Sequence, residues 1–130
     1  MTEQRTLVLA KSNGHCWYCG TALSGKWHVD HVKPIRRFEN VEITPKGIRK
    51  FMDCEHPELD CFDNLVPACA PCNLFKGGHS VEGFRAEIAA QVDRAMKYSV
   101  NFRTAMRFGL VELKIKPVVF WFEKQQHNTK

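Results

Sequence analysis

The chain has 130 residues, with 19 basic and 14 acidic side chains and a formal net charge of +5. This length suits one domain with a modest core, and the positive charge weakly favours a polyanionic partner such as nucleic acid. No apolar run approaches the ~18 residues that cross a bilayer, and the first residues lack a signal-peptide pattern. We therefore expect a cytoplasmic protein without a membrane partner, whose six cysteines stay reduced and act as metal ligands rather than as disulfides.

The first part of the chain predicts a short helix followed by a metal-binding turn. Residues 3–12 contain an apolar run that ends at Asn13-Gly14, a pair typical of a left-handed helix cap. Cys16 and Cys19 come next, with the Cys-x-x-Cys spacing of a zinc knuckle. A glycine after the second cysteine lets the backbone turn tightly, so that N–H groups can point at the thiolates.

Residues 27–32 predict a β-strand that carries two chemically distinct side chains. Asp30 and His31 are neighbours on this strand, so they point to opposite faces of it. Pro34 ends the strand because it cannot supply a backbone N–H to the next strand. Residues 34–63 show no clear periodicity, and we expect only short local structure there.

The middle of the chain repeats the knuckle in a different setting. Residues 64–68 predict a short strand, which leads directly into Cys69 and Cys72, a second Cys-x-x-Cys pair. Residues 73–76 then predict a short helix that two glycines end. A strand, a knuckle and a helix therefore follow one another without a linker.

The last part of the chain predicts two helices and a β-rich ending. Apolar side chains recur every four residues in 81–98, which indicates an amphipathic helix, and 100–108 suits a second helix. Apolar and charged residues alternate in 111–116, the pattern of a half-buried strand. The β-branched and aromatic run at 118–122 predicts another strand in the same layer, so the fold class is α+β.

The two knuckles together predict one structural zinc site. Four thiolates satisfy a tetrahedral zinc completely and leave no position for a substrate. The wide gap between the pairs suits a clip that joins the N-terminal region to the segment after residue 64. Ordinary buried cysteines are the alternative, and the repeated spacing argues against it. The predicted ligands are Cys16, Cys19, Cys69 and Cys72.

A second metal site is conceivable in the segment between the knuckles. Cys54, His56 and Cys61 carry suitable donor atoms. They lack knuckle spacing and a fourth ligand, so we favour free cysteines at these positions.

Several motifs, in the same order, resemble the HNH endonuclease family in its zinc-knuckle form. The matching segments are Asp30-His31-Val32-Lys33-Pro34, Asn64-Leu65 and Cys69-Ala70-Pro71-Cys72-Asn73-Leu74-Phe75-Lys76-Gly77. The family has a ββα-metal fold, in which two antiparallel strands and a helix surround one divalent cation. The resemblance covers about residues 14–78 and implies a zinc-clamped ββα-metal core. We expect a single HNH domain over 1–130, with additional helices and strands in a C-terminal extension at about 79–124.

The resemblance implies a DNA endonuclease with divided roles for its polar residues. His31 would be the general base, and Asp30 and Asn73 would bind a catalytic Mg²⁺ or Mn²⁺. Asn64 would fix the loop between the strands through hydrogen bonds. Attack in line would leave a 5′-phosphate and a 3′-hydroxyl. The residue types suit these roles, because histidine is an effective base near neutral pH and hard cations prefer oxygen ligands.

One departure from the family pattern concerns the third ligand of the catalytic cation. Many members carry a histidine four residues after the first helix ligand, where this chain has Gly77. His79 is poorly placed to replace it, because six residues span about 240° of an ideal helix. His28 shares a strand face with Asp30 and is the other candidate, although a partly exposed histidine without a ligand role is the simpler interpretation. The loss of nitrogen ligands favours Mg²⁺ or Mn²⁺ over a catalytic zinc.

DNA is the expected partner. Seven basic residues near the proposed site suit contacts with the DNA backbone and weak base specificity, although each one alone is more typical of solvated charge. They are Lys33, Arg36, Arg37, Lys46, Arg49, Lys50 and Lys76.

The resemblance extends to small phage-encoded members of the family. It suggests genome processing or packaging beside a phage terminase, in the host cytoplasm. A restriction-type HNH nuclease is one alternative. A non-catalytic zinc-containing module that binds nucleic acid is another, and it would need the four cysteines but not Asp30, His31 or Asn73.

Overall fold

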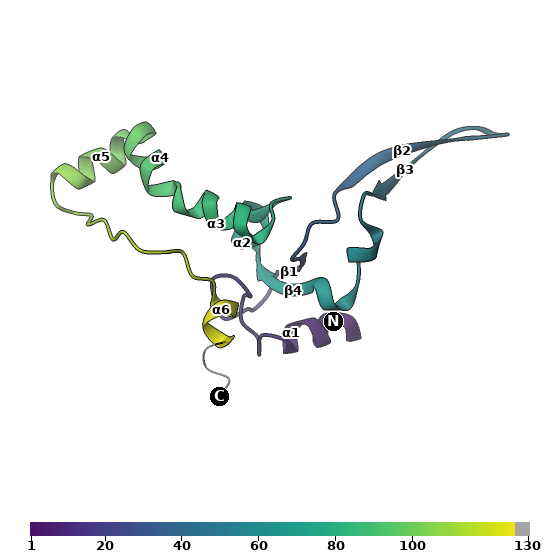
Figure 1. The fold of residues 1–130 in the computed structure, drawn as a ribbon, viewed down its shortest axis with the longest axis horizontal. Coiled ribbons are helices and arrows are strands. Elements are labelled where there is room, and N and C mark those ends of the chain that lie inside the picture. Colours follow the sequence, from purple (N-terminus) through teal and green to yellow (C-terminus); the bar gives the residue numbers. More distant parts are fainter. Residues whose placement is uncertain (127–130) are drawn as a thin grey trace.

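The computed structural model describes residues 1–126 and contains both helices and strands (Figure 1). The strands are β1 (Trp27–His31), β2 (Arg37–Thr44), β3 (Gly47–Cys54) and β4 (Leu65–Cys69). The helices are α1 (Glu3–Ala10), α2 (Ala70–Lys76), α3 (Val81–Ala89), α4 (Gln91–Tyr98), α5 (Val100–Arg107) and α6 (Trp121–Gln126), with short 3₁₀ turns at Pro57–Leu59 and Phe62–Asn64. No helix within residues 1–126 is long and apolar enough to cross a membrane.

The centre of the molecule is a pair of antiparallel strands followed by a helix. β1 pairs with β4 from Trp27 opposite Cys69 to His31 opposite Leu65. α2 begins directly after β4 and includes Pro71 in its first turn, where a missing N–H costs nothing. The strands predicted at 27–32 and 64–68 are confirmed, and the helix predicted at 73–76 starts three residues earlier.

Two apolar clusters lie on opposite faces of this strand pair. Successive residues of β4 supply them alternately, because side chains of a strand alternate between its faces. Leu65 packs with Val8 of α1 and Trp27 of β1, while Val66 joins the other cluster. The members of that second cluster are Cys16, Tyr18, Val66, Ala68, Phe84 and Phe120.

Residues 34–63 contain a long β-hairpin, which sequence reasoning missed. β2 and β3 pair only with each other, from Arg37 opposite Cys54 to Thr44 opposite Gly47. In Figure 1 this hairpin projects away from the centre on one side, and α3, α4 and α5 extend on the other. The hairpin buries neither face against the centre, so packing does not impose strict alternation. Val41 and Ile43 alternate with polar residues, but Phe51 and Met52 are adjacent, and the period-two signal is incomplete.

The single helix predicted at 81–98 is two helices, and the predicted helix at 100–108 is confirmed as α5. α3 ends at Ala89 and α4 begins at Gln91, so the predicted helix is interrupted at Ala90. α4 contacts α5, and neither helix supplies a residue to the central clusters of the described chain. A regular four-residue spacing predicts which side of a helix is apolar but does not say that one partner covers its full length.

The strands predicted at 111–116 and 118–122 are wrong. Residues 111–116 run without a β-partner, and Ile115 is fully exposed. Phe120 enters the core, and α6 begins at Trp121. The backbone N–H groups of Trp121 and Phe122 donate to the carbonyl oxygens of Tyr18 (2.8 Å) and Trp17 (3.1 Å) in the first knuckle. The aromatic run is therefore buried by the knuckle instead of by a neighbouring strand.

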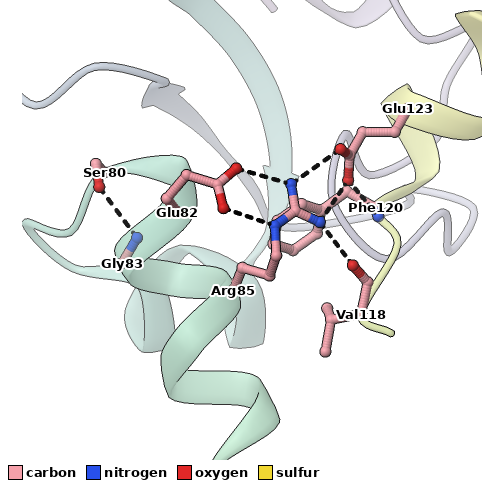
Figure 2. A network of polar contacts seen from close by, with 7 residues as sticks. All are labelled: Ser80, Glu82, Gly83, Arg85, Val118, Phe120 and Glu123. Carbon is pink, nitrogen blue, oxygen red and sulfur yellow. Dashed lines mark hydrogen bonds and ion pairs between the residues drawn. The ribbon is translucent and has the colours of Figure 1, made fainter. Parts of the chain in front are cut away.

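Arg85 joins α3 to this returning C-terminal segment (Figure 2). Its guanidinium donates to both carboxylate oxygens of Glu82 and of Glu123, and to the carbonyl oxygen of Val118 at 2.6 Å. It also lies over the ring of Phe120, 4.8 Å from the ring centroid. The Glu123 carboxylate and then that of Glu82 raise the pKa of Arg85 above its ordinary value, because both stabilise its charge.

We expect Phe84→Ala to lower the free energy of unfolding by about 3–5 kcal/mol, because Phe84 is fully buried between Tyr18 and Phe120. Phe108→Ala is the matched control. It should change that free energy by less than about 0.5 kcal/mol, since Phe108 is 75% exposed. Urea denaturation at saturating zinc measures both, and equal effects would mean that Phe84 is not part of the core.

Candidate functional site

Four cysteine sulfurs gather at one point beside the central strands. The Sγ atoms of Cys16, Cys19, Cys69 and Cys72 all lie within 4.8 Å of one another, and those of Cys19 and Cys69 are 3.7 Å apart. A tetrahedral zinc with Zn–S bonds of ~2.3 Å requires sulfurs about 3.8 Å apart. The cluster could therefore hold a structural metal such as zinc, and within residues 1–126 it is the only such group of three or more potential ligands.

Backbone hydrogen bonds bring the two knuckles together. The N–H of Trp17 donates to the carbonyl oxygen of Pro67 in β4 (2.9 Å), and the N–H of Cys69 donates to the Sγ of Cys16 (3.4 Å). Gly20 adopts a φ of +81°, and a Cβ there would lie 2.4 Å from the Trp121 ring. Glycine is thus needed at this turn for both its backbone conformation and its small size.

The surroundings of Cys16 favour its thiolate. Its pKa is lowered to about 4, first by a hydrogen bond from the Cys72 thiol and then by backbone N–H groups, although burial acts in the opposite direction. A thiolate is the form that binds a metal. Cys54 and Cys61 lie outside the cluster as free cysteines, and His56 lies instead beside the carboxylates of Glu55 and Glu58.

Asp30 is buried on the face of β1 that α2 covers. Its Oδ2 accepts a hydrogen bond from the Tyr18 hydroxyl (2.6 Å) and lies 3.2 Å from the Lys76 ammonium. Lys76 is fully buried and also donates to the carbonyl oxygen of His31 (2.9 Å). The predicted role of Lys76 as a DNA-backbone contact is therefore wrong, because its charge is used inside the protein.

His31 points to the opposite face of β1 and contacts Asp60. Its Nε2 lies 2.8 Å from Asp60 Oδ1. The hydrogen bond from His31 lowers the pKa of Asp60, so this carboxyl is ionised at neutral pH and can only accept. Nε2 is therefore the donor, and in neutral His31 the lone pair is on Nδ1. Sequence reasoning missed Asp60, since it belongs to no motif and lies in the segment whose fold was unreadable.

Asn64 and Asn73 lie on either side of β4 in the chain and differ in their hydrogen bonding. Asn64 is buried, and its amide bonds both the N–H and the carbonyl oxygen of Lys33 at 2.9 Å, and the carbonyl oxygen of Leu59 at 2.8 Å. These bonds tie the loop after β1 to the turn that carries Asp60. Asn73 is half-buried on α2, and its amide makes no hydrogen bond within residues 1–126.

The remaining predicted residues are more dispersed than the sequence suggested. His28 and His79 are exposed, and neither contacts Asp30 or Asn73 in the described part of the chain. The charge of Arg37 helps to lower the pKa of Asp60, so this residue does lie near His31. The prediction that all seven basic residues lie around the site is wrong for Lys46, Arg49 and Lys50, which lie at or next to the turn of the hairpin, at the end away from β1.

Comparisons with known proteins leave the family open. No protein-family model matches the chain, and neither the curated proteins nor the solved structures contain a match. The four-cysteine cluster and the residues around His31 and Asp30 therefore have to be interpreted from their own geometry.

Replacing one cysteine of the cluster should release the metal. We expect the purified chain to contain one zinc ion and Cys72→Ser to lose most of it, with a lower thermal midpoint, because a structural site contributes directly to folding. Cys54→Ser is the matched control, since Cys54 lies outside the cluster. Elemental analysis and thermal melts measure both. A parent protein without bound metal, or a Cys72→Ser variant that keeps a full equivalent, would contradict a zinc site.

Proposed function

We propose that this chain is an HNH-type endonuclease that hydrolyses phosphodiester bonds of DNA with the help of a divalent cation. Two antiparallel strands followed at once by a helix, β1, β4 and α2, correspond to the order of elements in the family's ββα-metal fold. The four-cysteine cluster would act as the zinc clamp of that core. The motif residues that carry the resemblance lie on these three elements or directly beside them.

The contact between His31 and Asp60 carries the proposal. A general base needs an acceptor nitrogen, a fixed orientation and a nearby group that stabilises its protonated form. Asp60 Oδ1, at 2.8 Å from Nε2, fixes the ring and compensates the charge that appears when the ring is protonated. Nδ1 of His31 would then take a proton from the attacking water.

Asn64 supports this base indirectly. Its three hydrogen bonds to Lys33 and Leu59 hold the end of β1 beside the turn that leads to Asp60. His31 and Asp60 come from segments 29 residues apart, so their contact depends on this cross-link. The role that the resemblance implied for Asn64, to fix a loop, is compatible with these contacts.

The side-chain oxygens of Asp30 and Asn73 are ligands of the kind that hard cations prefer, and each residue has one oxygen without a protein partner. Oδ2 of Asp30 is engaged by Tyr18 and Lys76, but Oδ1 has no protein partner within residues 1–126. Every buried polar side-chain atom within residues 1–126 has a hydrogen-bond partner. Since Oδ1 of Asp30 has none, it is exposed to solvent. The Asn73 amide oxygen is equally unused. When bound, Mg²⁺ or Mn²⁺ would neutralise charge on the phosphate and stabilise the leaving oxygen.

The buried ammonium of Lys76 limits how strongly these oxygens attract a cation. It lies 3.2 Å from Asp30 and offsets most of the carboxylate charge. Mg²⁺ commonly relies on one or two carboxylates together with substrate phosphates. We infer that DNA phosphate supplies the remaining negative charge, so that cation and DNA bind together.

The biological setting follows from the resemblance alone and is part of the proposal. Small phage-encoded members suggest genome processing or packaging beside a terminase in the host cytoplasm. The rival function is a non-catalytic zinc module that binds nucleic acid, which would need the four cysteines but not the His31–Asp60 contact.

His31→Ala should slow nicking strongly while leaving the fold intact. We expect the rate of plasmid nicking in Mg²⁺ or Mn²⁺ to fall by about 10²–10⁴, because loss of a general base typically costs that much. His28→Ala is the matched control and should nick at the parent's rate, since His28 is an exposed histidine of the same strand. EDTA should stop the parent. A His31→Ala variant as fast as the parent would refute the assignment, and a parent that binds DNA without nicking it would favour the zinc module.

Asp60→Asn should lower kcat by about 10–100-fold and leave KM nearly unchanged, because a residue that orients a catalytic group acts on the chemical step. Glu58→Gln is the control, an exposed carboxylate on the same turn that faces His56 instead of His31. Steady-state nicking kinetics separate the two parameters. An equal effect of both substitutions, or a change confined to KM, would show that Asp60 does not position His31.

A further inference from the structure

The hairpin formed by β2 and β3, residues 37–54, is an arm that the rest of the molecule leaves uncovered. Its strands pair only with each other, and most of its side chains are exposed. A two-stranded ribbon has no core of its own, so exposed apolar residues on it contribute only cross-strand contacts to its stability. A contiguous group of such residues marks a surface for binding.

Four exposed apolar residues of the arm share one face, and a fifth, Phe38, lies on the other face. Ile43 lies directly opposite Ile48, and both flank the Pro45-Lys46 turn with exposures of 87% and 70%. Val41 and Met52 lie on the same face, because side chains two or four positions apart on a strand point to the same side. Both are also exposed. The tip therefore presents a pair of branched apolar side chains to whatever the arm meets.

Basic side chains outnumber acidic ones in the outer part of the arm. Residues 39–52 contain Lys46, Arg49 and Lys50 against Glu39 and Glu42. Arg49 and Lys50 contact Glu42 (2.7 Å) and Glu39 (3.8 Å) across the ribbon. These ion pairs are exposed, and such pairs contribute little, so phosphates can readily replace the carboxylates. Lys46 makes no ion pair within the described residues.

The arm begins beside His31. The backbone N–H groups of Glu55 and His56 both donate to the carbonyl oxygen of Ile35, which closes the base of the ribbon. Arg36 has a φ of +52°, so the chain turns sharply as it leaves the centre. Arg37, the first residue of β2, lies near the carboxylate that holds His31. Eight-residue strands reach about 26 Å at ~3.3 Å per residue.

We infer that the arm binds duplex DNA beside the cleaved bond and inserts Ile43 and Ile48 between base pairs from the minor groove. Apolar side chains used in this way unstack a base step and bend the duplex, while neighbouring cations bind the phosphates on either side. Its reach of about 26 Å corresponds to roughly eight base pairs at 3.4 Å each. The inference rests on the proposed function for the position of the cut, but the binding itself does not require cleavage.

Charge decides between DNA and a second copy of the chain. Two arms that met through their apolar tips would bring together the Lys46 ammonium of each tip, which makes no ion pair within the described residues, and this repulsion opposes pairing. DNA supplies a phosphate for each cation and a stacked, apolar interior for the isoleucines.

The test measures binding without cleavage, in EDTA, with a 30-base-pair duplex that carries a fluorophore at each end. Fluorescence anisotropy gives the affinity and its salt dependence, and energy transfer between the ends reports bending. Two variants probe the arm, Ile43→Ser/Ile48→Ser and Lys46→Gln/Arg49→Gln/Lys50→Gln. Two controls remove the same kinds of side chain from exposed positions elsewhere, Leu110→Ser/Ile115→Ser and Lys97→Gln/Lys114→Gln/Lys116→Gln.

We expect the isoleucine variant to lose the bending signal and to bind roughly tenfold more weakly. The basic variant should reduce the slope of log affinity against log salt by up to about 2.7, since each released phosphate contact contributes about 0.9. Both controls should bind and bend DNA as the parent does. Zinc content and circular dichroism should match the parent in all four variants, because none of the substituted residues belongs to the core clusters.

Several results would overturn the inference. Parent-like bending by the isoleucine variant would exclude the wedge, and parent-like salt dependence of the basic variant would exclude phosphate contacts by the tip. A parent that dimerises in sedimentation experiments, while the isoleucine variant stays monomeric, would assign the tip to self-association. A parent that never nicks DNA but bends it through these residues refutes the proposed nuclease and supports the arm. A parent that nicks DNA without bending it supports the proposed nuclease and refutes the DNA-bending arm.

Discussion

The four cysteine sulfurs are the constraint on which the rest of this structure depends. They join the turn after α1 to the junction of β4 and α2, two regions about 50 residues apart in the chain. The C-terminal segment then packs on the first of these turns through Phe120, Trp121 and Phe122. The two apolar clusters are small, so packing alone leaves little margin for a chain of this length. A bound metal would fix the first turn in place, and with it the surface on which the C-terminal segment rests.

A second, polar constraint connects this platform to the candidate active site. Tyr18, one residue before Cys19, and Lys76, at the end of α2, both contact the buried oxygen of Asp30. A buried ion pair is rarely a net source of stability, because both charges lose their hydration. Its hydrogen-bonded geometry does fix how α2 lies against β1. It leaves His31 on the other face of β1, where this side chain contacts Asp60. Desolvation by burial, and then the charge of Asp30, raise the pKa of Tyr18, so its hydroxyl remains a donor at neutral pH.

Sequence reasoning succeeded where a short stretch specifies its own structure. Cys-x-x-Cys spacing predicted the cluster, and the strands at 27–32 and 64–68 have the apolar content of buried strands. It failed where the outcome depends on what a segment packs against. The hairpin at 37–54 buries no face against the centre, and so its alternation is incomplete. Residues 111–116 do alternate, yet no strand lies beside them. Residues 120–122 pack against the first knuckle instead of forming a strand. Asp60 could not be found for the same reason, because it contacts His31 only through the fold of a segment that Asn64 ties to the loop after β1.

His31 lies where the centre of the molecule meets the arm. It lies at the end of a central strand, and the arm starts six residues later, beside the carboxylate that His31 contacts. The centre is held by the cysteine cluster and by Asp30 and Lys76, whereas the arm is attached mainly through the backbone around Ile35. Substitutions at the tip of the arm therefore have no direct route to the hydrogen bonds of His31. If the arm grips DNA, it contributes to binding the substrate and to its shape, and the centre contributes the chemistry. Binding and cleavage would then be separable functions of one small chain.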